Sequence, residues 1–175
     1  MTIPNVPAGP LKVRMGRSSP GRYATHEFGK NVYNVKAFDA TGKALQFSLT
    51  QGDEYLIPTH GATVKVTYTL FGNWIDGTYA GFDETHAHMN IPATFMFPVG
   101  MDQRPRKVTF DHSDKEGWKV VTQLKPMGKD TYYAANFQYF MDSPIEIANS
   151  KTASWEVKGP TGKTQTIHLV SHSND

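Results

Sequence analysis

The stretch VKVTYTL, residues 64–70, alternates apolar and polar side chains without a break. Successive side chains of a β-strand point to opposite faces, so this pattern predicts a strand with one packed and one solvated face. Similar stretches rich in Val, Thr, Tyr and Phe occur at residues 11–15, 32–38, 45–50, 94–97, 107–110, 119–124, 154–157 and 164–170. Because short turn segments separate them, the sequence predicts an all-β fold, either an antiparallel β-sandwich or a saddle-like domain of two stacked sheets.

Helical periodicity is short and confined to one region. The best helix candidate runs from Tyr133 to Met141, and Pro144 should end it, because proline lacks an amide hydrogen and restricts the residue before it. We expect one or two short helices in all. The expected organisation is a flexible N-terminal segment at residues 1–10, a single β-rich domain at residues 11–171 and a tail at residues 172–175.

Composition narrows the possible functions. The 175 residues carry a net charge of +2, from 18 basic and 16 acidic side chains, which is too balanced to favour a nucleic-acid or membrane partner. The absence of cysteine excludes disulfides, thiolate metal ligands and a cysteine nucleophile. The opening residues lack the basic and apolar leader of a signal peptide, and the abrupt first and last strands suggest a piece of a longer protein.

A stiff corner is expected at residues 139–146, with the sequence YFMDSPIE. It would present Asp142, Ser143 and Glu146 on a fixed backbone, and we take these as candidate substrate-binding residues. The alternative is that Asp142 or Ser143 only caps the turn.

His86 and His88 flank a single alanine. Residues two apart in a strand face the same side, so both imidazoles could reach one metal ion, with Asp83 or Glu84 supplying oxygen. No third ligand is fixed by the local spacing, and the alternative is a polar strand edge. We therefore assign no metal site here and keep His86 and His88 as weak candidates.

Signatures of catalysis are absent. The sequence has no H-E-x-x-H zinc-peptidase motif, no G-x-S-x-G and no phosphate-binding glycine loop, so we expect no catalytic residue in this chain. Trp74, between Asn73 and Ile75, is a candidate platform for a sugar or a peptide.

Six segments in a fixed order carry a family resemblance: residues 19–23 (SPGRY), 26–32 (HEFGKNV), 68–72 (YTLFG), 83–90 (DETHAHMN), 117–120 (GWKV) and 140–146 (FMDSPIE). The series resembles the N-terminal domain of the glycyl aminopeptidase family, which are bacterial zinc metallopeptidases with a PDZ domain. The resemblance covers nearly the whole chain and implies a β-rich domain that precedes a thermolysin-like catalytic domain.

The resemblance also implies a division of labour. Zinc and the general base would lie in the catalytic domain, so this chain should hold no cofactor and have no peptidase activity alone. Its partners would be its own catalytic domain and a peptide substrate in the interdomain cleft. Asp142 and Glu146 would there bind the substrate α-amino group or brace the catalytic domain. Family members are often exported, which favours a periplasmic or other extracytoplasmic location. The rival is a free-standing β-sandwich module that binds carbohydrate or peptide.

Overall fold

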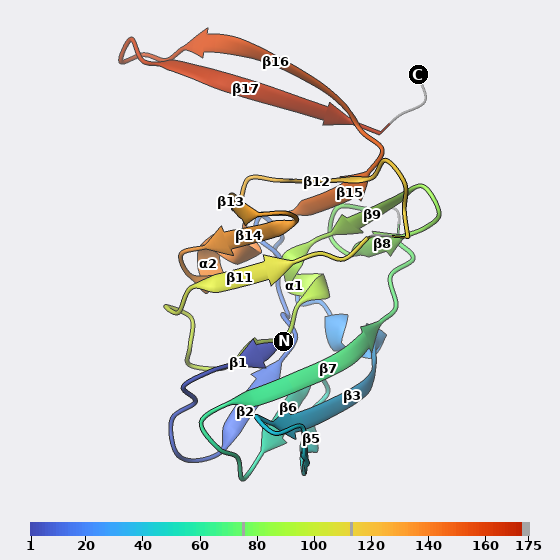
Figure 1. The fold of residues 1–175 in the computed structure, drawn as a ribbon, viewed down its shortest axis with the longest axis vertical. Helices are drawn as coiled ribbons and strands as arrows, with labels where there is room; N and C mark the ends of the chain where they lie inside the picture. The colour runs from blue at the N-terminus through green and yellow to red at the C-terminus, as the bar shows by residue number, and fades with distance from the viewer. Residues whose placement is uncertain (75, 113, 173–175) are drawn as a thin grey trace.

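The computed structural model describes residues 1–74, 76–112 and 114–172, and its pairings between strands are all antiparallel. The all-β prediction is confirmed, and the strands are divided among five sheets. Figure 1 shows an elongated molecule with a lower body, an upper body and a long hairpin at one end. Three short helical segments accompany the strands: η1 (Phe28–Asn31), α1 (Ile91–Thr94) and α2 (Phe137–Met141). None of these helices is long and apolar enough to cross a membrane.

Two four-stranded sheets form the lower body. The first has the spatial order β1 (Thr2–Ile3), β7 (Val64–Leu70), β3 (Val32–Asp39) and β4 (Ala44–Leu45). The second has the order β10 (Phe97–Pro98), β2 (Leu11–Arg14), β6 (Glu54–Ile57) and β5 (Ser48–Gln51). The alternation predicted for residues 64–70 is present in β7, where Val64 and Val66 are buried and Lys65 is exposed. Their side chains join a core shared with Val13 and Ile57.

The upper body has its own core. One of its two sheets, which we call sheet C, has the order β12 (Lys119–Thr122), β15 (Ile145–Ala148), β9 (His86–Met89) and β8 (Ala80–Phe82). Beside it lies a three-stranded sheet of β11 (Arg106–Thr109), β14 (Thr131–Ala134) and β13 (Lys125–Gly128). The core between them contains Phe137 and Phe140 of α2, together with Ile145 and Ile147 of β15.

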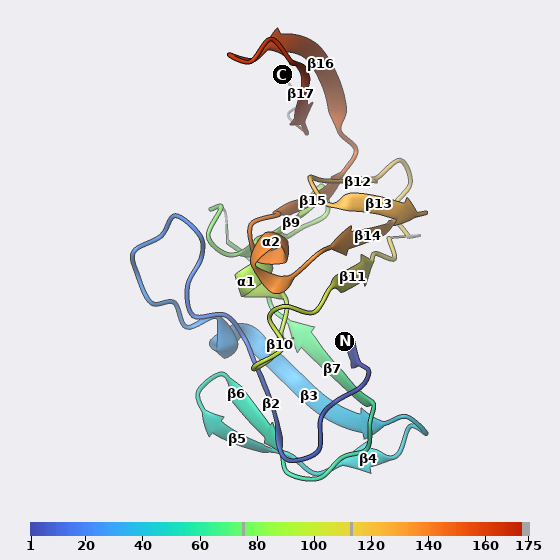
Figure 2. The ribbon, with the colours of Figure 1, turned by 90° about the vertical axis from the view of Figure 1, so that its left-hand side faces the viewer.

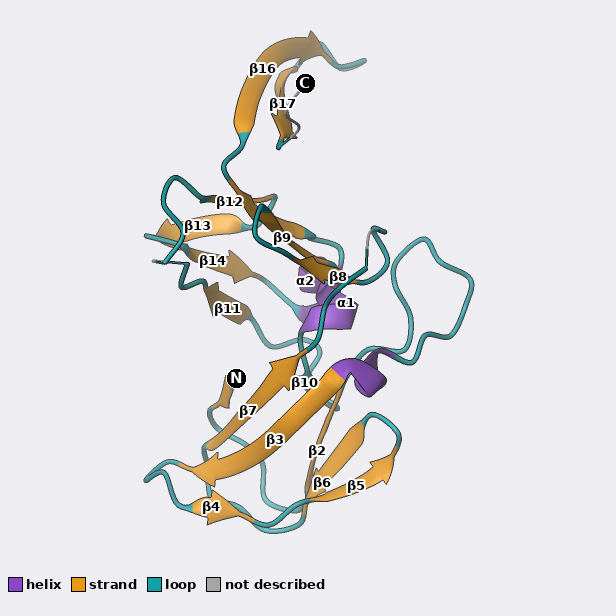
Figure 3. Ribbon diagram, turned by 90° about the vertical axis from the view of Figure 1, so that its right-hand side faces the viewer, coloured by secondary structure: helices purple, strands orange, loops and turns teal. Residues whose placement is uncertain are grey.

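Helix α1 lies between the two bodies, as Figures 1 and 3 show. All four of its residues are buried. Ile91 belongs to the upper core, whereas Ala93 belongs to the lower one. The hydroxyl of Tyr68 on β7 donates to the carbonyl of Thr94 at 2.9 Å and accepts from the amide of Met96 at 3.1 Å. The segment from α1 to Met96 therefore joins the two bodies by both packing and hydrogen bonds.

Several elements differ from the sequence predictions. Thr94 ends helix α1 instead of starting a strand, because this segment is buried on all sides and lacks a solvated face. The helix expected from Tyr133 begins only at Phe137, where the side chain of Asn136 caps it, and Tyr133 lies in β14. The stretch 45–50 is divided between β4 and β5.

The N-terminal segment, for which flexibility was expected, contains a short strand. Thr2–Ile3 forms β1, which pairs with β7, and Ile3 and Val6 are buried in the lower core. Apolar side chains spaced in this way give even a proline-rich segment enough burial to hold it on the sheet.

The last two strands form a hairpin that stands away from both bodies (Figure 2). Strand β16 (Lys151–Lys158) pairs with β17 (Thr164–Ser171) along its whole length. Every residue of β16 is exposed, and most of β17 is exposed as well. We call this hairpin the arm.

Candidate functional site

The corner after α2 is built as the sequence suggested, but it turns Ser143 inward. Ser143 is 0% exposed; its hydroxyl donates to the carbonyl of Tyr139 at 2.6 Å and accepts from the side-chain amide of Gln123 at 3.0 Å. These bonds satisfy a carbonyl in the last turn of the helix, which otherwise lacks a partner. Ser143 therefore acts as a cap, the alternative considered for this corner, and its hydroxyl does not face a cleft.

Asp142 is the C-terminal cap residue of α2 and is exposed. Its carbonyl accepts a hydrogen bond from Gln123 at 2.7 Å. Within the described part of the chain, its carboxylate forms no hydrogen bond or ion pair, so this acid remains available to a partner. That availability is compatible with the predicted binding role, which stays a prediction.

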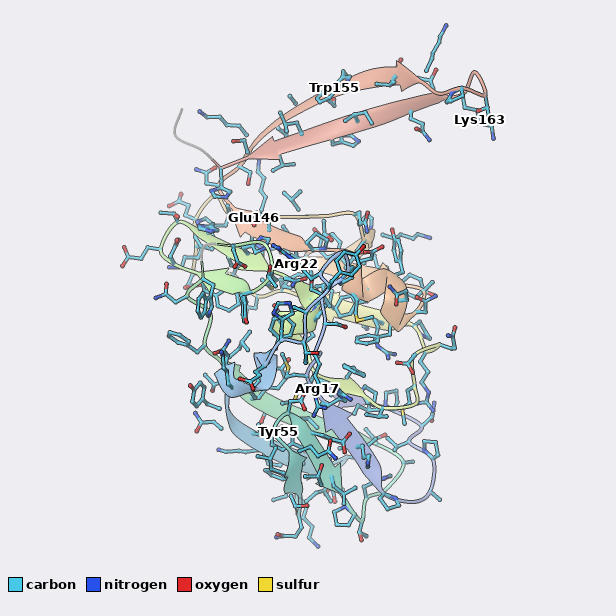
Figure 4. The ribbon with its side chains drawn as sticks, turned by 180° about the vertical axis from the view of Figure 1, so that it is seen from behind. Arg17, Arg22, Tyr55, Glu146, Trp155 and Lys163 are labelled. Atoms are coloured by element: carbon cyan, nitrogen blue, oxygen red, sulfur yellow. The ribbon has the colours of Figure 1, made fainter. Side chains whose placement is uncertain are left out.

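Glu146 lies in β15 directly opposite His88 of β9. Its Oε2 is 3.0 Å from His88 Nδ1, and its Oε1 is 3.3 Å from His172 Nε2. Glu146 is thus brought together with histidines rather than with Asp142. Figure 4 places it just below the start of the arm.

The histidine pair of β9 lies on the outer face of sheet C, as its spacing predicted. His86 and His88 alternate with Ala87 and Met89, which pack against the upper core. The ring of His86 stacks on the ring of His172, with centroids 4.5 Å apart and planes inclined by 19°. One ligand atom each of His86, Glu146 and His172 lies within 4.8 Å of the others.

His172 is the member of this cluster that the sequence did not reveal. It follows the last residue of β17 and was expected in a loose tail. Because it is distant from His86 and Glu146 in sequence, no local spacing could place it beside them. The only available signal was the residue type, a histidine near the end of a predicted strand.

Asp83 supplies negative charge beside the cluster. Hydrogen bonds from the hydroxyl and amide of Thr85 and from the amide of His86 lower the pKa of Asp83 to about 2, so it is ionised at neutral pH. Its Oδ1 lies 3.2 Å from His86 Nδ1. The hydroxyl of Thr85 is hydrogen-bonded to the same Nδ1 at 3.1 Å, so these two groups orient the imidazole and leave its Nε2 as the nitrogen available to a ligand.

Trp74 is 46% exposed, as a binding platform requires. One face of its indole is covered by the ring of Tyr79, with centroids 5.0 Å apart and an angle of 27°. At most one face of Trp74 is therefore open to a sugar or peptide.

The arm has two different faces. In its register Trp155 lies opposite Ile167, and Ala153 lies opposite Leu169, so their side chains share one face. The other face carries polar pairs such as Ser154 with His168 and Glu156 with Thr166. We define the apolar stripe as Ala153, Trp155, Val157, Ile167 and Leu169. Trp155 is 49% exposed and Leu169 is 54% exposed, which is unusual for side chains of this size.

A hollow of about 860 Å³ lies between the two bodies. Residues of β1, β7, β11 and α2 line it, and Asp142, Ser143 and Glu146 are not among them. The predicted substrate residues therefore do not converge on this hollow within the described part of the chain.

A family model described as the peptidase M61 N-terminal domain matches residues 1–149. The chain belongs to this family. This match confirms the resemblance drawn from the sequence motifs, namely to an N-terminal domain of an aminopeptidase-family protein. The match ends just before β16, so the arm lies outside it.

Two solved structures of longer chains are similar to this chain. An aminopeptidase N family protein from Idiomarina loihiensis superposes with a TM-score of 0.82 at 17% identity, over 97% of this chain and 29% of that chain. Legionella pneumophila aminopeptidase A in complex with aspartic acid gives a TM-score of 0.49 at 13% identity, over 94% of this chain and 20% of that chain. The chain thus spans less than a third of either protein. A search among curated proteins found no match.

Proposed function

We propose that this chain is the non-catalytic N-terminal β domain of a zinc aminopeptidase-like protein and that it supports a catalytic domain located elsewhere in that protein. Family membership and the small share of the Idiomarina protein that the chain spans support this proposal. The zinc ligands and the general base would lie outside this chain, which contains no H-E-x-x-H motif.

The observation that carries the supporting role is the apolar stripe of the arm. A two-stranded hairpin is marginally stable in water unless one of its faces is covered. Here Trp155 and Ile167 lie side by side on an exposed face, with Leu169 next to them on the same strand. Buried aromatic residues near the centre of an interface often carry most of its binding energy. The stripe is therefore the surface on which the catalytic domain would dock.

The docking role can be tested in the full-length parent protein with two single variants of the arm. Trp155→Asp places a charge on the apolar stripe, whereas the matched control Ser154→Asp places the same charge on the polar face of the same strand. Loss of an interface anchor is worth about 2 kcal/mol or more, so Trp155→Asp should lower the unfolding midpoint and the aminopeptidase activity. Equal midpoints and equal activities for the two variants would rule out docking through the stripe.

The second part of the proposal concerns the substrate. A carboxylate binds a peptide α-amino group by charge-assisted hydrogen bonds. The carboxylate of Asp142, which has no partner among the described residues, is suited to that task. Glu146 is already engaged with histidines, so the proposal rests mainly on Asp142. In the parent enzyme Asp142→Asn should raise KM for peptides with a free N-terminus, and Glu156→Gln on the arm should not. An unchanged KM would exclude Asp142 from substrate binding and leave it the role of bracing the catalytic domain or capping the turn.

A free-standing binding module is the rival function, and the exposed Trp74 is the observation that favours it. Under this rival, Trp74→Ala would abolish binding of an oligosaccharide or peptide to the isolated chain. A coding sequence that continues into an H-E-x-x-H segment would instead support the aminopeptidase proposal.

A further inference from the structure

Four polar side chains gather where the arm meets the upper body. His86 and His88 come from β9, Glu146 comes from β15, and His172 follows β17. Segments far apart in sequence thus converge on one place on the outer face of sheet C. The cluster combines imidazole nitrogens with a carboxylate, which is the ligand set that zinc and related divalent metals prefer.

Two atoms in this cluster are buried without a hydrogen-bond partner among the described residues. They are Oε1 of Glu146 and Nε2 of His88. The oxygen lies 3.3 Å from His172 Nε2, but the two atoms are not aligned for a hydrogen bond. Leaving a buried carboxylate oxygen without a bond costs free energy. A cation bound at this oxygen would remove that cost.

The geometry points to a binding site for a divalent transition metal, zinc in the first place, formed by His86, Glu146 and His172. Their ligand atoms lie within 4.8 Å of one another. Bonds of about 2.0–2.1 Å to a tetrahedral zinc ion bring ligand atoms to roughly 3.3 Å apart, so the most distant pair closes by at most about 1.5 Å. Oε1 of Glu146 and Nε2 of His172 are already 3.3 Å apart. His172 is partly exposed and follows the end of a strand, which leaves it room to make that movement.

Neighbouring groups orient two of the three ligands. Asp83 and the hydroxyl of Thr85 lie 3.2 Å and 3.1 Å from Nδ1 of His86 and leave its Nε2 for the metal, an arrangement common around bound metals. His88 holds the other oxygen of Glu146 through Nδ1 at 3.0 Å. His88 is therefore a positioning residue that leaves Oε1 for the metal. Three protein ligands leave the fourth position to water.

A metal bound here would connect the end of the arm to sheet C. His172 follows β17, whereas His86 and Glu146 belong to paired strands of the upper body. The ion would thus fix the base of the arm. This inference concerns only side chains of the present chain and does not depend on the proposed function.

The test is a titration of the chelator-treated 175-residue chain with Co²⁺, followed by visible absorption, and with Zn²⁺ in competition. We expect one ion per chain and the absorption bands of a low-coordinate Co²⁺ site. His172→Gln and Glu146→Gln should each weaken affinity at least ten-fold. His88→Gln should weaken it about 10–100-fold and keep the stoichiometry at one, as losses of orienting groups do elsewhere.

The matched control is His168→Gln, which removes an exposed histidine from the polar face of β17. It should bind Co²⁺ as tightly as the unchanged chain. Absence of the Co²⁺ bands would overturn the assignment. So would a His172→Gln variant with unchanged affinity, and this variant keeps the test decisive even where Glu146→Gln fails to fold, because His172 lies beyond the last strand.

Discussion

At the scale of single residues, Tyr68 shows how one side chain joins two parts of the molecule. Its hydroxyl is bonded on both sides of the turn after α1. Tyr68→Phe would leave the carbonyl of Thr94 and the amide of Met96 without that partner. We expect a loss of about 1–3 kcal/mol in the free energy of unfolding, measured by urea denaturation at neutral pH. An unchanged free energy would contradict this role.

The same residue gives a prediction for alkaline pH. Burial raises the pKa of the Tyr68 phenol above its ordinary value of 10.0. Between the unfolded and folded pKa values the folded state keeps a proton that the unfolded state has lost, so stability falls as pH rises. The contribution is fully present below about pH 10 and is lost through the folded pKa. The free energy of unfolding of Tyr68→Phe should therefore fall less steeply above pH 10. The slope should not vanish, because burial also raises the pKa of Tyr55 and Tyr132.

Ser143 offers a test of cap against ligand contact. Ser143→Ala removes the partner of the Tyr139 carbonyl and of the Gln123 amide inside a site that is 0% exposed. The free energy of unfolding of the isolated chain should fall by about 1–3 kcal/mol. The control Ser154→Ala changes an exposed serine of the arm and should leave it within about 0.5 kcal/mol. A stable Ser143→Ala chain would show that the cap is dispensable.

At the scale of elements, a close approach between η1 and the β5–β6 turn restricts one position to glycine. A Cβ on Gly29 would meet the side chain of Asp53 and lie 2.9 Å from its Cα. Asp53 is buried and paired with Arg17, so it has little room to move. Gly29→Ala should lower the free energy of unfolding by about 1–3 kcal/mol, as overpacked sites do.

The matched control is Gly61→Ala, where the added Cβ meets nothing within 4 Å. Chemical denaturation of both variants would measure the difference. Equal midpoints for the two variants would mean that Asp53 moves away from the added Cβ without loss of stability.

How well a helix or strand could be predicted depends on whether it has one buried and one solvated face. The strand at residues 64–70 was predicted correctly because one face is buried and the other is solvated. Apolar and polar residues therefore alternate along its sequence. Helix α1 was missed because its four residues are buried all round and no periodicity remains. The arrangement of His86, His88 and Glu146 was predictable only in part. The shared face of His86 and His88 follows from strand geometry, but the pairing of β9 with β15 depends on tertiary contacts.

At the scale of the whole molecule, stability should be distributed unevenly. The arm has strand hydrogen bonds but little packing over them, whereas β9 and β15 lie in the middle of sheet C and cover the upper core. Local opening is easiest where few apolar contacts protect the backbone. In chelator-containing buffer, amides of residues 151–171 should exchange hydrogen much faster than those of β9 and β15. Mass spectrometry of peptic fragments would measure this, and equal protection would mean that the arm is covered.

The arm also has two free edges. In the part of the chain that the structure describes, neither β16 nor β17 has a second neighbour. An unpaired edge beside an apolar face is a template for strands of other molecules. Aggregation of the purified chain would therefore begin at the arm, and dilute storage or a mild detergent that coats Trp155 and Leu169 is the practical remedy.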